Sequence, residues 1–396
     1  MNKLSILIFD GSEKKSTFIN RLIKGLVQHG HKVTVAEFHS DKKNRITGAT
    51  YINLGSERKK IKLIVSSGKL LLQTLFKTSP YSRYSNLISG FVKFDINSIR
   101  KVNLFNAILK TKPDVVHLQW LSLLPFCEEL LDKGLTKFVL SQRGTHINVR
   151  PFIDEDNYNY LRKIFAKIDG FHSVSKAMKQ KSKLIYSDDN KIDEVIYSGL
   201  NISNIDFNTG YSKDETIELL SVGRPHWIKG YTTMIQVCKE LANRNLDFNY
   251  TIIGANKNSE ELLYLISQNN LSDRVHLKSK ISQEEVFQLM RSSSALVLPS
   301  LEEGIANVAI EAMAIGLPVI STNCGGMAEL IKDNKSGYLV PVNNKKALVD
   351  AIIKFSQEGP EKINILRQNA RQKVEVQHNT SKMVEDMEKL YYKCLS

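Results

Sequence analysis

Short runs of apolar residues alternate along this chain with longer segments in which apolar positions recur every three or four residues. The first run, at 4–9, is followed by a turn at Gly11, an amphipathic stretch at 16–29 and a second apolar run at 32–38. A short apolar run predicts a buried strand, and the longer period predicts a helix. Strands and helices in alternation predict a parallel sheet.

The alternation continues along the chain with one interruption, a polar stretch near 197–213 that predicts a linker. Further strands are predicted at 114–118, 137–141 and 170–174 before this linker, and at 217–222, 249–253, 275–277, 295–298 and 318–321 after it. We therefore expect two doubly wound α/β domains, over 1–200 and 201–375, and a C-terminal helix over 376–396 that can cross back to the first domain. Ligands are expected at the carboxyl ends of the strands.

Length and composition agree with two globular domains. A chain of 396 residues exceeds one ordinary domain, and its content of 42% apolar and 24% charged residues excludes a collagen-like or mostly disordered protein. The four cysteines lack the spacing of a metal site or a disulfide framework. No apolar run is long enough to span a membrane, and the N-terminal run lacks a small-residue cleavage site. These features predict a cytoplasmic protein.

The net charge of +14 is concentrated in the first half of the chain. Residues 1–200 carry 33 basic and 18 acidic side chains, and residues 58–112 carry 12 Lys or Arg against the single Asp95. Cations that flank apolar clusters there predict contact with an anionic membrane surface or an anionic acceptor. The alternative is a helix whose apolar face packs on the sheet while its lysines are solvated. No nucleic-acid recognition motif accompanies the charge, so we expect no nucleic-acid partner.

The segment 300–320 combines a turn, two carboxylates and an apolar helix. It follows a predicted strand, bends at Gly304 and enters a helix in which Glu311 stands among apolar residues. A carboxylate is unfavourable to bury unless it is hydrogen-bonded, and a helix N-terminus offers free N–H groups to an anion. The segment therefore predicts a phosphate-and-ribose site. The alternative is that Glu311 lies on a solvated stripe and Glu303 only favours the helix N-terminus.

Two cations follow the first predicted strand of the second domain. Arg224 and Lys229 stand in a loop that ends at Gly230. Fixed cations at the carboxyl end of a strand can neutralise a departing diphosphate, although two cations in a loop are often only solvated.

Together these segments resemble the retaining GT-B glycosyltransferases of glycosyltransferase family 4, the glycosyl transferases group 1. Glu303 and Glu311 stand in an EGxxxxxxE arrangement that continues through GLPVIST at 316–322 to Gly325 and Gly326, and residues 223–230 resemble the family's GRxxxxKG segment. The resemblance implies a GT-B architecture, in which two Rossmann-like domains face each other across a cleft. It also implies a retaining hexosyltransferase that uses a nucleotide diphosphate sugar and no essential cofactor.

The same resemblance assigns donor binding mainly to the second domain. Arg224 and Lys229 would stabilise the diphosphate, Glu303 would contact the sugar or the developing oxocarbenium charge, and Glu311 would hold the ribose. Residues 275–282 resemble the segment whose backbone recognises the nucleobase. The expected donor-binding residues are Arg224, Lys229, Lys280, Ile281, Glu303, Gly304, Ile305, Ala306, Asn307 and Glu311, and the first two and Glu303 are the expected catalytic residues.

Three residues of the first domain are expected on the acceptor or sugar side. Gly11 follows the first strand, where the family places a loop near donor and acceptor, although a lone glycine also suits any tight turn. Arg143 stands where many relatives carry a histidine beside the transferred sugar. His146 either substitutes for that histidine or is an ordinary loop histidine.

An acidic triplet, 154–156, matches the DxD pattern that another glycosyltransferase fold uses to hold a divalent metal. Here it precedes an apparent helix, and acidic residues in the first turn of a helix interact favourably with its dipole. We therefore expect no metal site.

The expected function is the transfer of a sugar, with retention, to an acceptor hydroxyl in the synthesis of a cell-surface polysaccharide or glycolipid. The acceptor would be a glycan, a glycolipid or another hydroxyl compound, and the protein could be peripheral on the inner face of the plasma membrane. The alternatives are a non-catalytic nucleotide-sugar-binding protein and a same-fold nucleotide-sugar epimerase.

Overall fold

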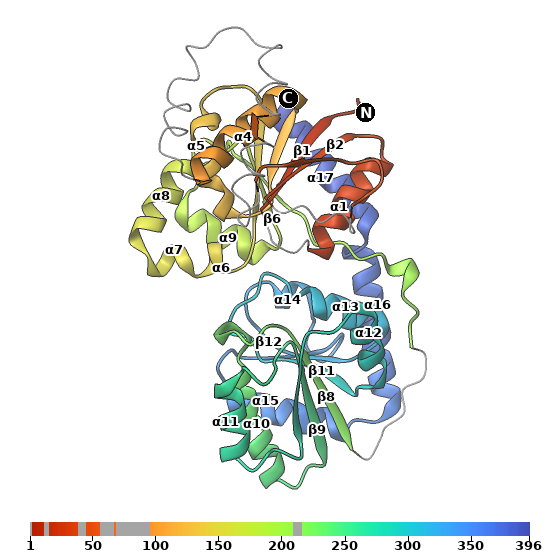
Figure 1. The fold of residues 1–396 in the computed structure, drawn as a ribbon. Helices are drawn as coiled ribbons and strands as arrows, with labels where there is room; N and C mark the ends of the chain where they lie inside the picture. The colour runs from red at the N-terminus through yellow and green to blue at the C-terminus, as the bar shows by residue number, and fades with distance from the viewer. Residues whose placement is uncertain (1, 12–15, 39–44, 56–66, 69–95, 209–215) are drawn as a thin grey trace. The chain divides into compact units, whose positions relative to one another are not determined.

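A computed structural model describes residues 2–11, 16–38, 45–55, 67–68, 96–208 and 216–396 (Figure 1). The chain divides into two compact units. The first comprises Met1–Val174, Met178–Gly199 and Thr380–Ser396, and the second comprises Ser175–Ala177 and Leu200–Asn379. Each unit is described by itself.

The first unit contains a seven-stranded parallel sheet with the order β3-β2-β1-β4-β5-β6-β7. Strand order reverses between β1 and β4, and the carboxyl ends of strands at such a reversal are where open α/β sheets bind ligands. The strands are β1 (Ser5–Asp10), β2 (Lys32–Glu37), β3 (Thr50–Asn53), β4 (Val115–Leu118), β5 (Lys137–Gln142), β6 (Gly170–Ser173) and β7 (Ile192–Val195).

The second unit contains a six-stranded parallel sheet with the order β10-β9-β8-β11-β12-β13. Its order reverses between β8 and β11, and the loops after these two strands carry the main candidate residues. The strands are β8 (Ile217–Val222), β9 (Phe248–Ile253), β10 (Val275–Lys278), β11 (Ala295–Leu298), β12 (Val319–Thr322) and β13 (Tyr338–Val340).

Helices cover both faces of each sheet, because strands that are apolar on both sides must be buried on both sides. In the first unit, α4, α5, α8 and α9 pack on one face, and α1 and α17 pack on the other. Its helices are α1 (Thr17–Gln28), α4 (Ile96–Thr111), η3 (Leu121–Leu123), α5 (Leu124–Leu131), α6 (Thr145–Asn148), α7 (Arg150–Ile153), α8 (Glu155–Phe165), α9 (Lys176–Ile185) and α17 (Thr380–Leu395).

In the second unit, α10, α11 and α15 cover one face of the sheet, and α12 and α13 cover the other with much of α16 (Figure 1). Its helices are η4 (Ile202–Asn204), η5 (Trp227–Lys229), α10 (Tyr231–Asn243), α11 (Glu260–Gln268), α12 (Gln283–Ser292), α13 (Asn307–Ile315), α14 (Met327–Leu330), α15 (Lys345–Gln357) and α16 (Pro360–Gln377).

The C-terminal helix α17 packs beside α1 in the first unit (Figure 1). Two glycines permit this close approach. A Cβ at Gly25 would lie 2.3 Å from Val384 Cγ2, and a Cβ at Gly170 would lie 2.4 Å from Cys394 Sγ. The final segment of the chain is therefore part of the core of the first unit.

The two parallel α/β sheets confirm the predicted fold class, and the strands expected from apolar runs are present within one or two residues of the predicted bounds. The prediction missed three short strands at or near sheet edges, β3, β7 and β13. In β7, which contains two acidic residues, every residue is only partly buried, so no apolar run marks it.

Much of the basic segment 58–112 lies outside the described residues. Its described helix α4 is a core helix, in which Arg100 is buried with its guanidinium 4.3 Å from the ring centre of Phe38. Over 96–111 the structure therefore agrees with the alternative, in which an apolar face packs on the sheet. Within the described residues, no helix is both long and apolar enough to cross a bilayer.

Candidate functional site

In the second unit, the loops after β8 and β11 contact each other through a backbone hydrogen bond and a close glycine contact. The N–H of Leu301 donates to the carbonyl of Ile228 at 2.7 Å, and Gly230 has a φ of 65°. A Cβ at Gly230 would lie 2.0 Å from the carbonyl oxygen of Pro299, so the contact requires glycine. This close approach brings the end of the β8 loop against the β11 loop.

Lys229 and Glu303 meet where the two loops join. Lys229 Nζ lies 2.6 Å from Glu303 Oε1, and the side chains are 23% and 14% exposed. The Ser300 hydroxyl donates to the same carboxylate oxygen at 2.9 Å. Burial, and then the Glu303 carboxylate, raise the pKa of Tyr231. The structure thus brings together two of the three residues expected to be catalytic.

Two glycines of the β12–α14 turn hold the loop that carries Glu303. A Cβ at Gly325, which has a φ of 50°, would lie 1.7 Å from the Glu303 carbonyl oxygen, and a Cβ at Gly326 would lie 2.1 Å from that of Gly304. The N–H of Gly326 donates to the Gly304 carbonyl at 2.8 Å. The glycines quoted from the sequence therefore allow one backbone to close on another.

Helix α13 begins directly after this loop, and the N–H of Ala306 at its start donates to Met327 Sδ at 3.5 Å. Ala306 is the N-cap residue, makes no side-chain capping bond, and is followed by a first turn without acidic residues. Gly304 and Ile305 precede it, and Asn307 is the first helical residue. An uncapped helix N-terminus combines backbone donors with the positive end of the dipole, an arrangement suited to a phosphate.

Glu311, in α13, is partly buried and accepts a hydrogen bond from Gln283 Nε2 at 2.9 Å. Gln283 is the first residue of α12, and the sequence prediction missed it. The exposed Lys280 and the partly buried Ile281 lie just before it, in the segment after β10. Through Gln283, the expected base-recognition segment is joined to the carboxylate expected to hold the ribose.

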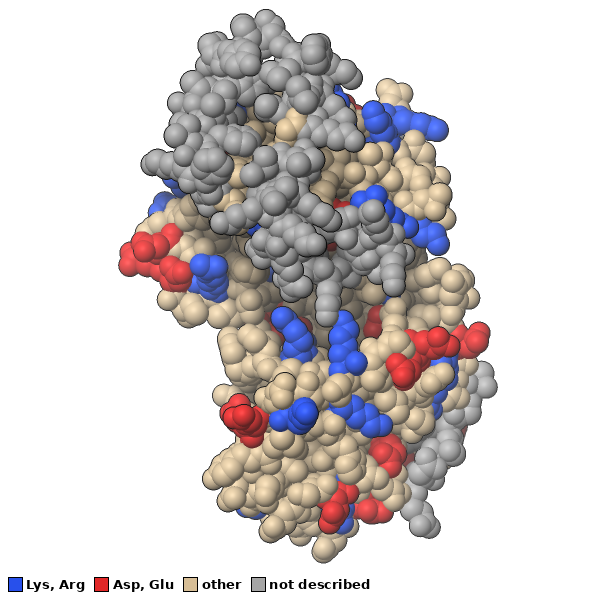
Figure 2. Space-filling model, in the orientation of Figure 1, with Lys and Arg blue, Asp and Glu red and all other residues tan. Residues whose placement is uncertain are grey.

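Arg224 is exposed in the β8 loop. The second half of the chain carries 22 basic and 23 acidic side chains, so attraction for an anion depends on their local arrangement. On the face of the second unit seen in Figure 2, Lys and Arg side chains gather in one region with Asp and Glu side chains around it.

In the first unit, Asp10 and Trp120 meet at the reversal between β1 and β4. Asp10 is buried, and the Trp120 indole N–H donates to its Oδ1 at 3.2 Å. A Cβ at Gly11 would lie 2.5 Å from Leu123 Cδ2 and 3.0 Å from Phe38. Close packing therefore explains this glycine, and the residues that follow it, 12–15, lie outside the described part of the chain.

The guanidinium of Arg143 belongs to a buried network of polar side chains that the sequence analysis did not predict. Its guanidinium lies 4.2 Å from the ring centre of Phe18 and donates to the Ser141 hydroxyl at 3.4 Å. Burial lowers the pKa of Arg143 to about 9, although the Asp10 carboxylate and then Tyr391 act in the opposite direction.

Two histidines complete this network. The Ser141 hydroxyl lies 2.8 Å from His117 Nε2 and 2.8 Å from His172 Nδ1, and His117 Nδ1 lies 2.7 Å from the Tyr391 hydroxyl of α17. Burial and then the Arg143 charge lower the pKa of His172 to about 3. The sequence signal that could have revealed this network is a polar residue inside each of three apolar strands, His117 in β4, Ser141 in β5 and His172 in β6.

His146 stands in the short helix α6 rather than in a loop and is partly buried. Burial, and then Arg150, lower its pKa. The acidic triplet opens helix α8 as predicted: Asp154 is the N-cap residue and accepts from the N–H of Asn157 at 3.0 Å.

Comparisons with known proteins find glycosyltransferases that are similar to this chain. Over 169 residues, the chain is 34% identical to the putative colanic acid biosynthesis glycosyltransferase WcaL of Escherichia coli, covering 41% of this chain and 42% of that protein. Over 242 residues, it is 30% identical to the amylovoran biosynthesis glycosyltransferase AmsK of Erwinia amylovora, covering 60% and 59%. The alignments thus span about two fifths to three fifths of these relatives.

Solved structures match almost the whole chain. Sucrose-phosphate synthase from Thermosynechococcus elongatus superimposes with a TM-score of 0.77 at 17% identity, covering 99% of each chain. HepE from Anabaena in complex with UDP-glucose superimposes with a TM-score of 0.73 at 15% identity, covering 98% of this chain and 100% of that one. Residues 203–373 match the family Glycosyl transferases group 1. The second unit therefore contains a glycosyl transferases group 1 domain, and the chain has the two-domain fold of the GT-B glycosyltransferases.

Proposed function

We propose that this protein is a retaining glycosyltransferase, of the hexosyltransferase type of glycosyltransferase family 4, that moves a sugar from a nucleotide diphosphate donor to an acceptor hydroxyl. The observation that carries the proposal is the Lys229–Glu303 pair beside the uncapped N-terminus of α13. A cation, a carboxylate and the start of a helix thus converge at the carboxyl ends of two adjacent strands, where open α/β sheets bind ligands. The glycosyl transferases group 1 match covers the same residues.

The donor diphosphate would lie at the N-terminus of α13. The amides of Gly304, Ile305 and Asn307 would donate to its oxygens, and Arg224 and Lys229 would supply positive charge. The base would lie near Lys280 and Ile281, and Glu311, oriented by Gln283, would accept from the ribose hydroxyls. A diphosphate in this position would share Lys229 with Glu303.

In the transfer step, the bond from the anomeric carbon to the diphosphate oxygen breaks while the acceptor oxygen attacks the same face. The departing phosphate oxygen takes the acceptor proton. Lys229 and Arg224 stabilise charge that grows on the leaving group, and Glu303 stabilises positive charge that grows on the sugar ring. The Ser300 hydroxyl and the paired glycines of the β12–α14 turn hold Glu303 for this task.

The acceptor would be a glycan, a glycolipid or another hydroxyl compound bound by the first unit, with Gly11, Arg143 and His146 on that side. The relatives named for colanic acid and amylovoran biosynthesis favour a role in cell-surface polysaccharide synthesis. Of the basic segment 58–112, the part that precedes the core helix α4 would hold the protein at an anionic, cytoplasmic membrane face. The transfer step as proposed requires no metal ion.

A thermal-shift panel of UDP, GDP and ADP with their sugar conjugates tests donor binding, because a ligand that binds only the native state raises the melting temperature. We expect one nucleotide to raise it equally with and without magnesium. Arg224→Ala should lose this shift, whereas Lys239→Ala, at an exposed lysine of α10, should keep it. A panel without any shift, or one unchanged in Arg224→Ala, would contradict the donor site.

Turnover separates an enzyme from a binding protein. We expect Glu303→Gln to bind the nucleotide and remain folded while product formation falls by at least a hundredfold, the range found when one electrostatic stabiliser is removed. Proton NMR of the product gives the anomeric configuration. Retention supports the proposed mechanism, inversion contradicts it, and interconversion of the nucleotide sugar without transfer indicates an epimerase.

A further inference from the structure

Tyr231 closes the loop that carries Arg224 and Lys229. It is the first residue of α10, and its hydroxyl donates to the carbonyl of Gly223, the first residue after β8, at 3.2 Å. The end of β9 contacts the same carbonyl from another side, because a Cβ at Gly254 would lie 2.5 Å from its oxygen. One side-chain hydrogen bond thus joins the two ends of the loop, and both cations stand between these ends.

The aliphatic part of Lys229 lies beside the same glycine. A Cβ at Gly223 would lie 3.0 Å from the Tyr231 hydroxyl oxygen, and 3.2 Å and 3.6 Å from Lys229 Cε and Cδ. The absence of a side chain at Gly223 therefore makes room for both groups. Beyond Cε, the ammonium of Lys229 lies 2.6 Å from Glu303 Oε1. The phenol that closes the loop and the lysine that pairs with Glu303 thus pack against one backbone position.

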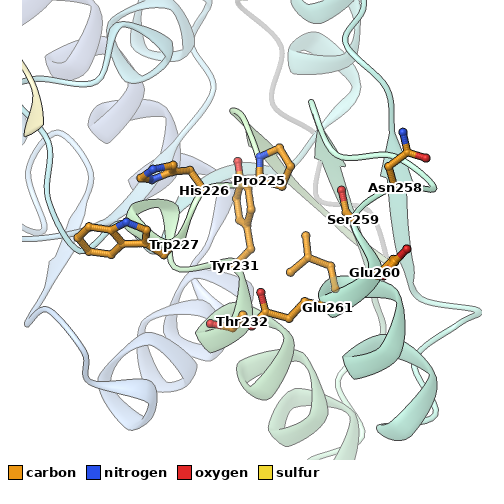
Figure 3. A pocket seen from close by; sticks show the side chains of 10 residues that line it. Pro225, His226, Trp227, Tyr231, Thr232, Asn258, Ser259, Glu260 and Glu261 are labelled. Carbon is orange, nitrogen blue, oxygen red and sulfur yellow. The ribbon is translucent and has the colours of Figure 1, made fainter.

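The Tyr231 hydroxyl is a buried donor without charge. The residue is 5% exposed, and a carbonyl oxygen only accepts, so the hydroxyl must donate. Burial, and then the Glu303 carboxylate, raise the pKa of Tyr231, so the phenol keeps the proton that this bond requires. In Figure 3 the Tyr231 ring lies between Trp227 and the labelled residues of α11, and its hydroxyl end points towards the turn at Pro225. The hydroxyl is therefore directed at the loop rather than at solvent.

We propose that Tyr231 is a positioning residue for Lys229, and that it directs the Lys229 ammonium to Glu303 by closing the loop after β8. Without the hydroxyl bond, the base of the loop is freer, and the ammonium is held less accurately for a charge that develops only in the transition state. This effect on catalysis rests on the proposed function, in which Lys229 stabilises the departing diphosphate. The effect on the pair of Lys229 and Glu303 does not rest on it.

Tyr231→Phe removes the hydroxyl and keeps the ring, whereas Tyr231→Ala would enlarge the cavity of about 300 Å³ that the ring lines. Nitrogen-15 NMR of the lysine ammonium groups reads the pair directly in the full-length protein, because an ammonium held by a carboxylate exchanges its protons slowly with water. Lys229→Met identifies the signal. We expect Tyr231→Phe to shift or broaden it. Tyr264→Phe, the matched control at a tyrosine of α11 that is 64% exposed, should leave it unchanged.

Kinetics show whether the effect on transfer passes through Lys229. We expect Tyr231→Phe to lower kcat about fivefold, as the loss of one hydrogen bond would, while the donor KM stays within twofold. In a Lys229→Met background the same substitution should cause no further loss, because the group that Tyr231 positions is absent. A residue that only supported the fold would lower kcat by the same factor in both backgrounds. Tyr264→Phe should leave kcat unchanged.

Two results would overturn the proposal: an unchanged Lys229 signal in Tyr231→Phe, or an equal loss of kcat with and without Lys229. If Tyr231→Phe fails to fold, Gly223→Ala adds a methyl group against the same hydroxyl and should shift the same signal, and an unchanged signal there also overturns the proposal. A changed Lys229 signal in a protein without transferase activity would leave the positioning role standing and contradict the proposed function. The two proposals can therefore fail separately.

Discussion

Replacing Lys229 by methionine keeps most of the length of the side chain and removes the cation that pairs with Glu303. The pair is 2.6 Å apart with exposures of 23% and 14%, so it lies between a surface pair and a buried one. Breaking a fully buried pair by removing one partner destabilises a protein by roughly 3–5 kcal/mol, and an exposed pair contributes about 0–1 kcal/mol. For this intermediate burial we expect Lys229→Met to lower the free energy of unfolding by about 2 kcal/mol.

The partner substitution separates charge coupling from lost packing. Glu303→Gln should destabilise by about 1 kcal/mol, because the remaining ammonium can reach water more easily than the carboxylate can. In the double variant, no unpaired charge remains. It should recover part of the loss and give a coupling energy of about 1–2 kcal/mol.

Urea unfolding measured by tryptophan fluorescence can follow the second unit alone. Trp120 lies in the first unit and Trp227 in the second, so a Trp120→Phe background reports on the unit that holds the pair. With a denaturant slope of about 2 kcal/mol/M, the Lys229→Met midpoint should fall by about 1 M. Arg244→Met breaks an exposed pair with Glu240 in the same unit and should shift the midpoint far less.

A coupling energy below about 0.3 kcal/mol, within the range of independent sites, would refute this reasoning. So would an Arg244→Met shift as large as that of Lys229→Met. Either result would mean that the recorded proximity of Lys229 and Glu303 does not stabilise the fold. The proposed sharing of Lys229 between Glu303 and a diphosphate would then lose its energetic basis.

Three further predictions follow from the described contacts. Burial lowers the pKa of His172 from 6.5 to about 3, so below about pH 6.5 the unfolded chain takes up a proton that the folded chain does not. The free energy of unfolding should therefore fall as the pH is lowered, by up to about 1.4 kcal/mol per pH unit. Urea midpoints from about pH 7 to about pH 5 should show a slope that His172→Gln reduces, and an unchanged slope would contradict the assignment. Gly25→Ala places a Cβ 2.3 Å from Val384 Cγ2 and should lower the free energy of unfolding of the first unit by about 1–3 kcal/mol. Unfolding followed by Trp120 fluorescence in a Trp227→Phe background measures this, and no change would show that α17 can shift freely. Gln283→Ala removes the hydrogen bond to Glu311 and should raise the donor KM about tenfold while kcat stays within twofold. A tenfold fall in kcat would instead place Gln283 in the chemical step.

Local sequence pattern was sufficient where structure depends on neighbours in the chain. Apolar runs predicted the central strands of both sheets, because a strand covered on both faces must be apolar throughout. Asp154 was recognised as part of a helix start because a cap is made with a residue three positions away. The prediction also identified the loops that hold Lys229 and Glu303, since motif spacing and strand ends are local properties.

The tertiary structure decided the contacts between segments that are distant in the chain. The bond from Gln283 to Glu311, the network joining His117, Ser141 and His172, and the fit of α17 against Gly25 depend on strand order, register and helix packing. The short strands near the sheet edges gain their conformation from a neighbouring strand rather than from an apolar run of their own. The spacing of apolar residues specifies which face of a helix or strand is buried. Which other elements pack against that face depends on long-range packing, and this is seen only in the folded chain.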